Sequence, residues 1–218
     1  MSNMPEPIYL IAILIMLGLA PFVAMMVTSY VKIVIVMSLI RNALGIQQIP
    51  PNMVINGLSI ILSLYIMNPV AQETYEILRN NWETIDAKDI SSIEAVMEKT
   101  KQPLKEFLLK HASERERAFF FDAAKELWPE ERSAALTNDD LMVLAPAFTV
   151  SELTEAFQIG FLIYLPFIAI DIIVSNILLA MGMMMVSPMT ISLPFKLLLF
   201  VVIDGWARLI HGLLLTYG

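Results

Sequence analysis

The sequence contains no cysteine and only two histidines. The absence of cysteine excludes a disulfide framework, thiolate chemistry and any metal site built from cysteine. No run rich in lysine or arginine occurs, and the formal net charge is −7. Because binding to phosphate groups needs a concentrated basic surface, nucleic acid is not expected as a partner.

Charged residues are also scarce and unevenly placed. They make up 16% of the chain, whereas soluble domains average about 25%. Residues 72–150 hold 16 acidic and 10 basic side chains, which leaves nine formal charges for the rest of the chain. We therefore expect the middle of the chain to meet water and its two flanks to meet lipid or other protein.

Four apolar stretches in the flanks are long enough to cross a bilayer, which takes roughly 20 residues. They cover residues 8–40, 53–71, 157–185 and 191–215. Pro21 in the first stretch and Pro166 in the third predict kinks, because proline removes a helical hydrogen bond. The expected fold is an all-α membrane protein with two helical hairpins of long, kinked, hydrophobic helices. They flank a small helical extramembrane domain, which divides the chain into 1–71, 72–150 and 151–218.

The N-terminus differs from a cleaved signal peptide. It carries Glu6 and no lysine or arginine before the first apolar stretch, and that stretch is too long for the apolar core of a signal peptide. We expect it to be retained. Orientation follows from the cations near the two short turns: Lys32 and Arg41 precede the first, and Lys196 follows the second. By the positive-inside rule both turns face the cytoplasm, so the acidic middle segment and both termini face outward.

The middle segment has a helical pattern of apolar residues. Pro103 is predicted in the first turn of a helix, and Trp128-Pro129 marks the end of another. Nothing in this segment groups like a catalytic site or a metal site, and His111 is expected to be a solvated helix residue. The predictions are therefore no catalysis, no metal and no cofactor.

After the middle segment, Thr149 and Glu152 have the spacing of a capping box at a helix start. Glu152 and Glu155 would then lie in the first turns of that helix, where the helix dipole favours acidic side chains.

Ionisable residues within the apolar stretches are costly and usually pair or face a cavity. Asp171, Asp204 and Arg208 are of this kind, and Lys196 lies nearby. Asp204 and Arg208 are four residues apart, so a local ion pair is available. Contact of Asp204 with a neighbouring subunit is the alternative, and the sequence leaves both open.

Methionines gather between the third and fourth stretches. Five of the chain's 15 methionines fall in nine residues, namely Met181, Met183, Met184, Met185 and Met189. Methionine has a flexible, polarisable side chain that adapts to varied partners, whereas leucine serves better for plain helix packing. The pattern favours a compliant contact surface over ordinary packing.

Several long motifs resemble one known family. One follows the middle segment and consists of Pro146-Ala147-Phe148, Ser151-Glu152-Leu153, Ala156-Phe157 and Ile159-Gly160-Phe161. The others are residues 41–52, residues 171–185, Ser192-Leu193-Pro194-Phe195-Lys196 and Asp204-Gly205-Trp206. Together they resemble the R-type export-apparatus protein of type III secretion, called FliP in flagella and YscR, SctR or SpaP in injectisomes. Flagellar members generally begin with a cleavable signal sequence, so the N-terminus described above favours the injectisome branch.

The resemblance implies a core channel-forming subunit that translocates unfolded proteins across the bacterial inner membrane. Family members form a homo-oligomeric, pentameric ring together with the S- and T-type membrane proteins, and unfolded secretion substrates pass through it. Within this family the methionine-rich loop constricts the channel, which assigns Met181, Met183, Met184 and Met185 to the pore constriction.

Two other function classes fit parts of the sequence. A small-solute secondary transporter uses broken helices and midplane charges, to which Pro166 and Asp171 correspond faintly, although the four stretches show no internal repeat. A membrane-anchored enzyme needs a cluster of acid and base groups, and a membrane-anchored scaffold needs none. Proton-coupled uptake into vesicles that contain only this protein would indicate the transporter. Hydrolytic activity of the isolated middle segment would indicate the enzyme.

Overall fold

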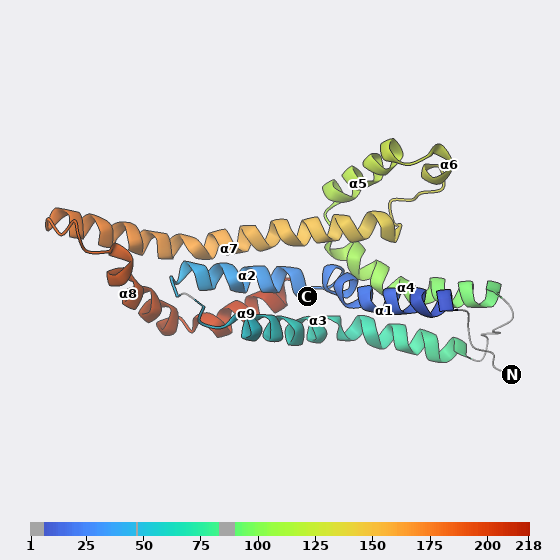
Figure 1. Ribbon diagram of the computed structural model, residues 1–218, viewed down its shortest axis with the longest axis horizontal. Coiled ribbons are helices and arrows are strands. Elements are labelled where there is room, and N and C mark those ends of the chain that lie inside the picture. The colour runs from blue at the N-terminus through green and yellow to red at the C-terminus, as the bar shows by residue number, and fades with distance from the viewer. Residues whose placement is uncertain (1–6, 47, 83–89) are drawn as a thin grey trace.

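The computed structural model describes residues 7–46, 48–82 and 90–218, and its regular structure in these ranges is entirely helical (Figure 1). The predicted all-α class is therefore confirmed. The helices are α1 (Pro7–Met26), α2 (Tyr30–Ala43), α3 (Asn52–Asn81), α4 (Ile90–His111), α5 (Glu114–Leu127), α6 (Glu130–Ser133), α7 (Leu141–Ala180), α8 (Pro188–Val202) and α9 (Gly205–Leu215).

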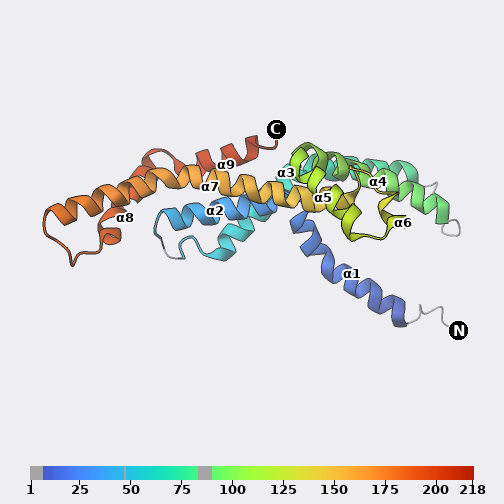
Figure 2. The ribbon, with the colours of Figure 1, turned by 90° about the horizontal axis from the view of Figure 1, so that it is seen from above.

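Helix α7 is the axis of the molecule. Its 40 residues correspond to a length of roughly 60 Å, and α2 packs along it in both ribbon views (Figures 1 and 2). Pro146 and Pro166 both lie inside α7, so the predicted kink at Pro166 does not interrupt the helix. Neighbouring helices can satisfy the carbonyl groups that an internal proline frees.

The predicted capping box at Thr149 and Glu152 is wrong, because α7 begins at Leu141 with Asp140 as its N-cap residue. Thr149 and Glu152 lie in the helix interior. The Thr149 hydroxyl lies 3.1 Å from the carbonyl oxygen of Met26 and 2.8 Å from that of Ala145. Thr149 therefore touches the end of α1 instead of starting a helix.

Two of the apolar stretches are bent, at places that the prolines did not predict. The first bends by 61° between α1 and α2, and Pro21 lies inside α1. The last bends by 59° between α8 and α9, at Asp204, whose backbone is left-handed with φ 53°. Within the described residues, α3 and α7 are long and apolar enough to cross a membrane, and counting each bent pair as one span gives up to four.

The polar middle segment is continuous with the apolar helices. The boundaries 71/72 and 150/151 fall inside α3 and α7, so the three-part division stays a prediction. Helix α4 begins at Ile90 and contains Pro103 in its interior, which corrects the predicted start. Helix α5 ends at Leu127, directly before Trp128-Pro129, as predicted. In Figure 1, α5 and α6 project from the long axis of the molecule on the same side as α7.

Two hydrophobic clusters lie along α7. The larger joins α2, α3, α7, α8 and α9, with Ile33, Val36, Ile40 and Phe167 at its centre. The smaller joins α4 and α7 around Leu108, Leu144 and Phe148, and includes Tyr217 beyond the end of α9. Helix α1 stands apart from both clusters (Figure 2), and its large side chains from Leu14 to Met26, except Met25, are more than half exposed.

Close packing of α2 against α7 depends on Gly160. A Cβ atom at this position would collide with the Leu39 side chain, whose Cβ and Cγ would lie only 3.2 and 3.3 Å away. We expect Gly160→Ala to lower the free energy of unfolding by about 1–3 kcal/mol, the usual cost of overpacking. Thermal unfolding in detergent measures the effect. Gly57→Ala is the control, because nothing lies within 4 Å of its Cβ position; equal effects of the two substitutions would contradict the close approach.

Candidate functional site: buried charges and the methionine turn

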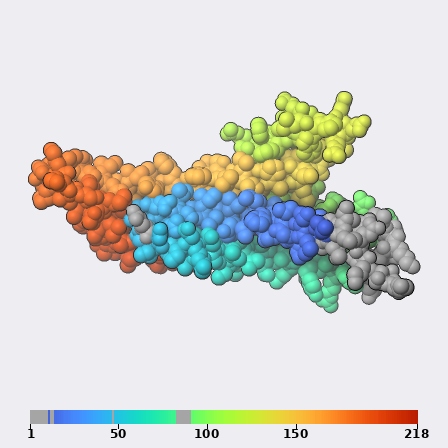
Figure 3. All heavy atoms as spheres, in the orientation of Figure 1, coloured from blue at the N-terminus to red at the C-terminus, as the bar shows by residue number. Residues whose placement is uncertain are grey.

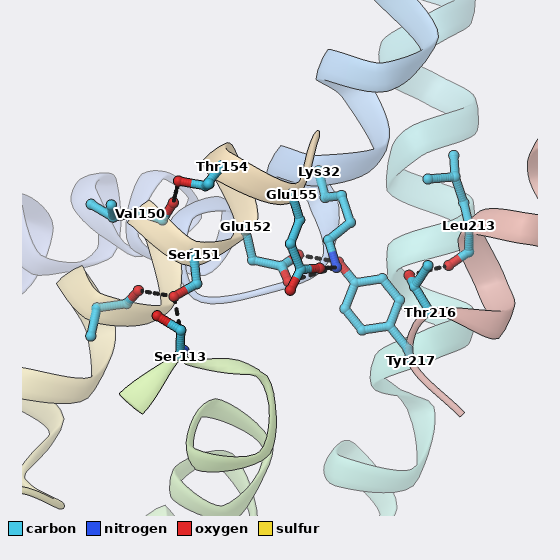
Figure 4. A network of polar contacts seen from close by, with 11 residues as sticks. Lys32, Ser113, Val150, Ser151, Glu152, Thr154, Glu155, Leu213, Thr216 and Tyr217 are labelled. Atoms are coloured by element: carbon cyan, nitrogen blue, oxygen red, sulfur yellow. Dashed lines mark hydrogen bonds and ion pairs between the residues drawn. The ribbon is translucent and has the colours of Figure 1, made fainter. Parts of the chain in front are cut away.

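A lysine is buried at the junction of the two clusters. Lys32 on α2 is 1% exposed, and its Nζ lies 2.8 Å from Glu152 Oε1 and 2.7 Å from Glu155 Oε2. The two glutamates stand three residues apart on α7, which places them on one face of the helix. All three side chains point toward one another in Figure 4. The ion pairs thus tie α2 to α7.

Tyr217 completes this buried charge cluster, which we define as Lys32, Glu152, Glu155 and Tyr217. Its hydroxyl donates a short hydrogen bond to Glu152 Oε2, and its ring centroid lies 4.2 Å from the Lys32 Nζ. Buried charges are costly unless paired and hydrogen-bonded. Oε1 of Glu152 is in the ion pair with Lys32, and Oε2 accepts the hydrogen bond from Tyr217. The segment after α9 is thereby held against α2 and α7.

The cluster borders on His111 at the end of α4. Its ring centroid lies 5.1 Å from that of Tyr217 and 4.8 Å from that of Phe107. His111 is half-buried, which corrects the expectation of a solvated residue. Burial, followed by the charges of Lys110 and Lys32, lowers the pKa of His111 to about 4. The imidazole is therefore neutral near pH 7.

A second ion pair joins two residues that the sequence singled out. Lys196 on α8 is 3% exposed, and its Nζ lies 2.6 Å from Asp171 Oδ2 on α7. It also donates to the carbonyl of Ala43, at 3.1 Å, and the Ser192 hydroxyl donates to Asp171 Oδ1, at 2.6 Å. This pair connects α7, α8 and the end of α2.

Asp204 and Arg208 are not brought together. In the described parts of the chain, no ion pair within 4 Å includes either of them. The local ion pair that their spacing allowed therefore does not form. Both side chains are exposed, Asp204 at the bend before α9 and Arg208 one turn into that helix.

The methionine turn, residues 181–187, follows α7. Met181, Met183, Met184 and Met185 are 62%, 45%, 80% and 101% exposed. Gly182 has φ 74°, and the amide of Met183 donates to the carbonyl of Leu178 at 2.9 Å, which is a common way to end a helix. The turn lies at one tip of the molecule, where α7 and α8 extend past α2 and α3 (Figures 1 and 3).

The sequence missed the role of the buried charge cluster. In the sequence analysis, Lys32 counts only as a cation near a turn. Glu152 and Glu155 are interpreted there as residues at the start of a helix. The available signal was Lys32, a single cation within the first apolar stretch, since such charges usually pair. With Lys32 and Lys196 buried in ion pairs, the predicted orientation rests on Arg41, which donates to Asn52 and Pro50.

Nothing in these sites is arranged for metal binding among the described residues. The geometry instead provides ion pairs that hold separate helices together. The cluster around Lys32 holds α2, α7 and the C-terminal segment, and the pair of Asp171 and Lys196 holds the hairpin of α7 and α8.

The cluster makes a prediction for stability. We expect Glu152→Ala to lower the free energy of unfolding by about 3–5 kcal/mol, because it breaks a buried pair. The combination Lys32→Met with Glu152→Leu should recover most of this loss, since no buried charge is then left unpaired. Denaturant unfolding in detergent measures both. Glu155→Ala, at a side chain 48% exposed, is the control with a smaller effect, and a combined variant as unstable as Glu152→Ala would contradict the pairing.

His111 makes a prediction for pH dependence. Its pKa is about 4 in the folded protein and about 6.5 when unfolded, so the unfolded chain binds the proton more readily. Stability is therefore full above pH 6.5 and falls as the pH drops from 6.5 toward 4. His111→Gln should flatten this decline in thermal unfolding scans, whereas His211→Gln, at an exposed position on α9, should not. Identical profiles for His111→Gln and the original protein would refute it.

Comparison with known proteins places the chain in a family. A protein-family model described as the FliP family matches residues 13–213. Along their full lengths, the chain is 56% identical to "Yop proteins translocation protein R" of Yersinia pestis, over 218 residues and 100% of both chains.

Two further relatives agree. The "Hypersensitivity response secretion protein HrcR" of Ralstonia nicotianae is 50% identical over 208 residues, which cover 95% of this chain and 96% of that protein. The "Surface presentation of antigens protein SpaP" of Salmonella typhimurium is 41% identical over 222 residues, covering 98% of each chain. This chain therefore belongs to the FliP family, the R-type proteins of type III secretion.

Proposed function

We propose that this chain is a channel-forming subunit of the type III export apparatus, through which unfolded proteins cross the bacterial inner membrane. The exposed methionine turn carries the proposal. Four apolar side chains are presented at the tip of a long apolar hairpin, and the described residues of the chain leave them exposed. Flexible thioether side chains from several copies could surround a narrow passage and yield to any side chain that arrives.

A second feature supports assembly with other membrane proteins. Helix α1 carries large apolar side chains that the described chain leaves uncovered, among them Leu14, Met16, Leu17 and Phe22. An uncovered apolar helix needs lipid or another protein around it. The proposed partners are further copies of this chain in a pentameric ring, together with the S- and T-type proteins of the apparatus.

The proposed orientation puts the turn between α2 and α3 in the cytoplasm and the polar segment from α4 to α6 in the periplasm. Arg41, beside the first turn, supports this by the positive-inside rule. Alkaline phosphatase fused near Asn138 should be active and the same fusion near Gln48 inactive, because the enzyme folds only in the periplasm. The opposite pattern would reverse the orientation.

The channel proposal predicts a leak. Replacing Met183, Met184 and Met185 together by Ala should leave the ring assembled but let small solutes cross, because the apolar constriction is lost. Native gels measure assembly, and the release of a small fluorescent dye from cells measures the leak. The control replaces Met53, Met97 and Met142, which are more than half exposed but lie away from the turn, and should not leak. A tight triple variant would show that the turn does not seal a passage.

A further inference from the structure

Charges outside residues 72–150 are few and nearly all are paired. There are nine in the sequence, and eight of them lie in the described residues. Five take part in the ion pairs of Lys32, Glu152, Glu155, Asp171 and Lys196. Arg41 donates hydrogen bonds to the turn after α2. In the described parts of the chain, Asp204 and Arg208 are thus left without a side-chain partner.

These two remaining charges stand on an apolar surface. Helices α8 and α9 together are long and apolar enough to count as one broken membrane span. Several of their apolar side chains are exposed, among them Val201, Val202 and Leu215. An ionisable side chain in such a setting is costly unless it finds an opposite charge. Asp204 and Arg208 carry opposite charges, so a single kind of contact could satisfy both.

The Asp204 backbone keeps the carboxylate available. Asp204 is in the left-handed conformation, with φ 53° and ψ 50°, directly before α9. A non-glycine residue in this conformation is strained, and such strain is concentrated at functional positions. An aspartate at a helix start normally accepts a hydrogen bond from the first turn, but the Asp204 side chain makes no capping bond.

A pocket beside Asp204 suits a guanidinium group. Its volume is about 300 Å³, and it lies between the α8–α9 bend and the turn that joins α2 to α3. Asp204, Phe200 and Trp206 line it with apolar residues of that turn, and the two rings meet edge to face at 5.4 Å between centroids. Arginine pairs with carboxylates and stacks on aromatic rings, so one carboxylate beside two rings matches its side chain.

We propose that this pocket receives Arg208 from a second copy of the chain. The inference rests on the proposed function and deepens it, because it names a contact between neighbouring subunits of the ring. Each copy carries both the pocket and Arg208, so it can give its Arg208 to one neighbour and receive the Arg208 of another, which makes a head-to-tail contact. Repeated around a closed ring, such a contact leaves no Asp204 and no Arg208 unpaired. The complementary charges on one apolar segment favour a second copy over a lipid headgroup.

Charge reversal with two differently tagged copies tests the contact. Asp204→Arg alone and Arg208→Asp alone each put like charges into the contact, and co-purification of the two tags should be lost. Co-expression of one copy of each variant should restore it, because the two reversed side chains then meet as an opposite pair, and they can do so only between chains. Without such rescue the contact is not between copies. The reversals Arg132→Asp and Asp139→Arg, at exposed positions near α6, are controls that should change nothing.

Crosslinking gives a second test, on a chain that has no native cysteine. Ile203→Cys in one tagged copy and His211→Cys in the other keep both charges and flank the proposed contact. A short bis-maleimide should join the two tags, and Asp204→Asn should abolish the product. If native gels show an intact ring but no crosslink forms, the contact is wrong and the channel proposal stands. If no ring forms with the original chain, the channel proposal itself fails. A product with another membrane protein would also overturn the contact.

Discussion

The buried ammonium group of Lys32 constrains the arrangement of three separate segments. An ion of this kind cannot stay charged in an apolar interior without close partners, and here the partners come from α7 and from the segment after α9. Helix α2 must therefore meet α7 in one register, and the last residues of the chain must return to the same place. The apolar clusters on either side can then close around this point. Nonspecific apolar packing would hold the helices together, but it would not fix their register.

The ion pair of Asp171 and Lys196 also fixes the position of helices, nearer to the methionine turn. Asp171 lies about five helical turns beyond Glu152 on α7, and its bond to Lys196 brings α8 back along α7. Because Lys196 also reaches the carbonyl of Ala43, the hairpin is attached to α2 as well. The methionine turn beyond it has no comparable bond from its side chains to the rest of the described chain. The two ion pairs therefore hold the hairpin of α7 and α8 in place, whereas the side chains of the methionine turn stay free to adapt.

Sequence alone predicted the helical class and the end of α5, and it singled out Asp171 and Lys196, which form an ion pair. It failed where tertiary contacts decide local structure. Pro103 was expected in the first turn of a helix, yet it lies inside α4. Pro21 and Pro166 were expected to mark kinks, and neither interrupts its helix. The bends fall elsewhere, where Thr149 contacts the end of α1 and where Asp204 is left-handed. Tyr217 could not have been placed, because its role depends on a partner 65 residues away.

The distance between the cluster and the turn has a mechanical consequence. From Glu152 to the end of α7 at Ala180 the helix extends roughly 42 Å. Asp171 lies about two thirds of the way along this segment, and its bond to Lys196, which also reaches Ala43 on α2, holds α7 a second time. Only the last roughly 14 Å of the helix extends past both ion pairs. The position of the methionine turn is therefore set by two charged contacts between α7 and α2 and not by contacts of the turn itself. The charges that fix where the turn stands lie away from it, on the part of α7 that packs against α2.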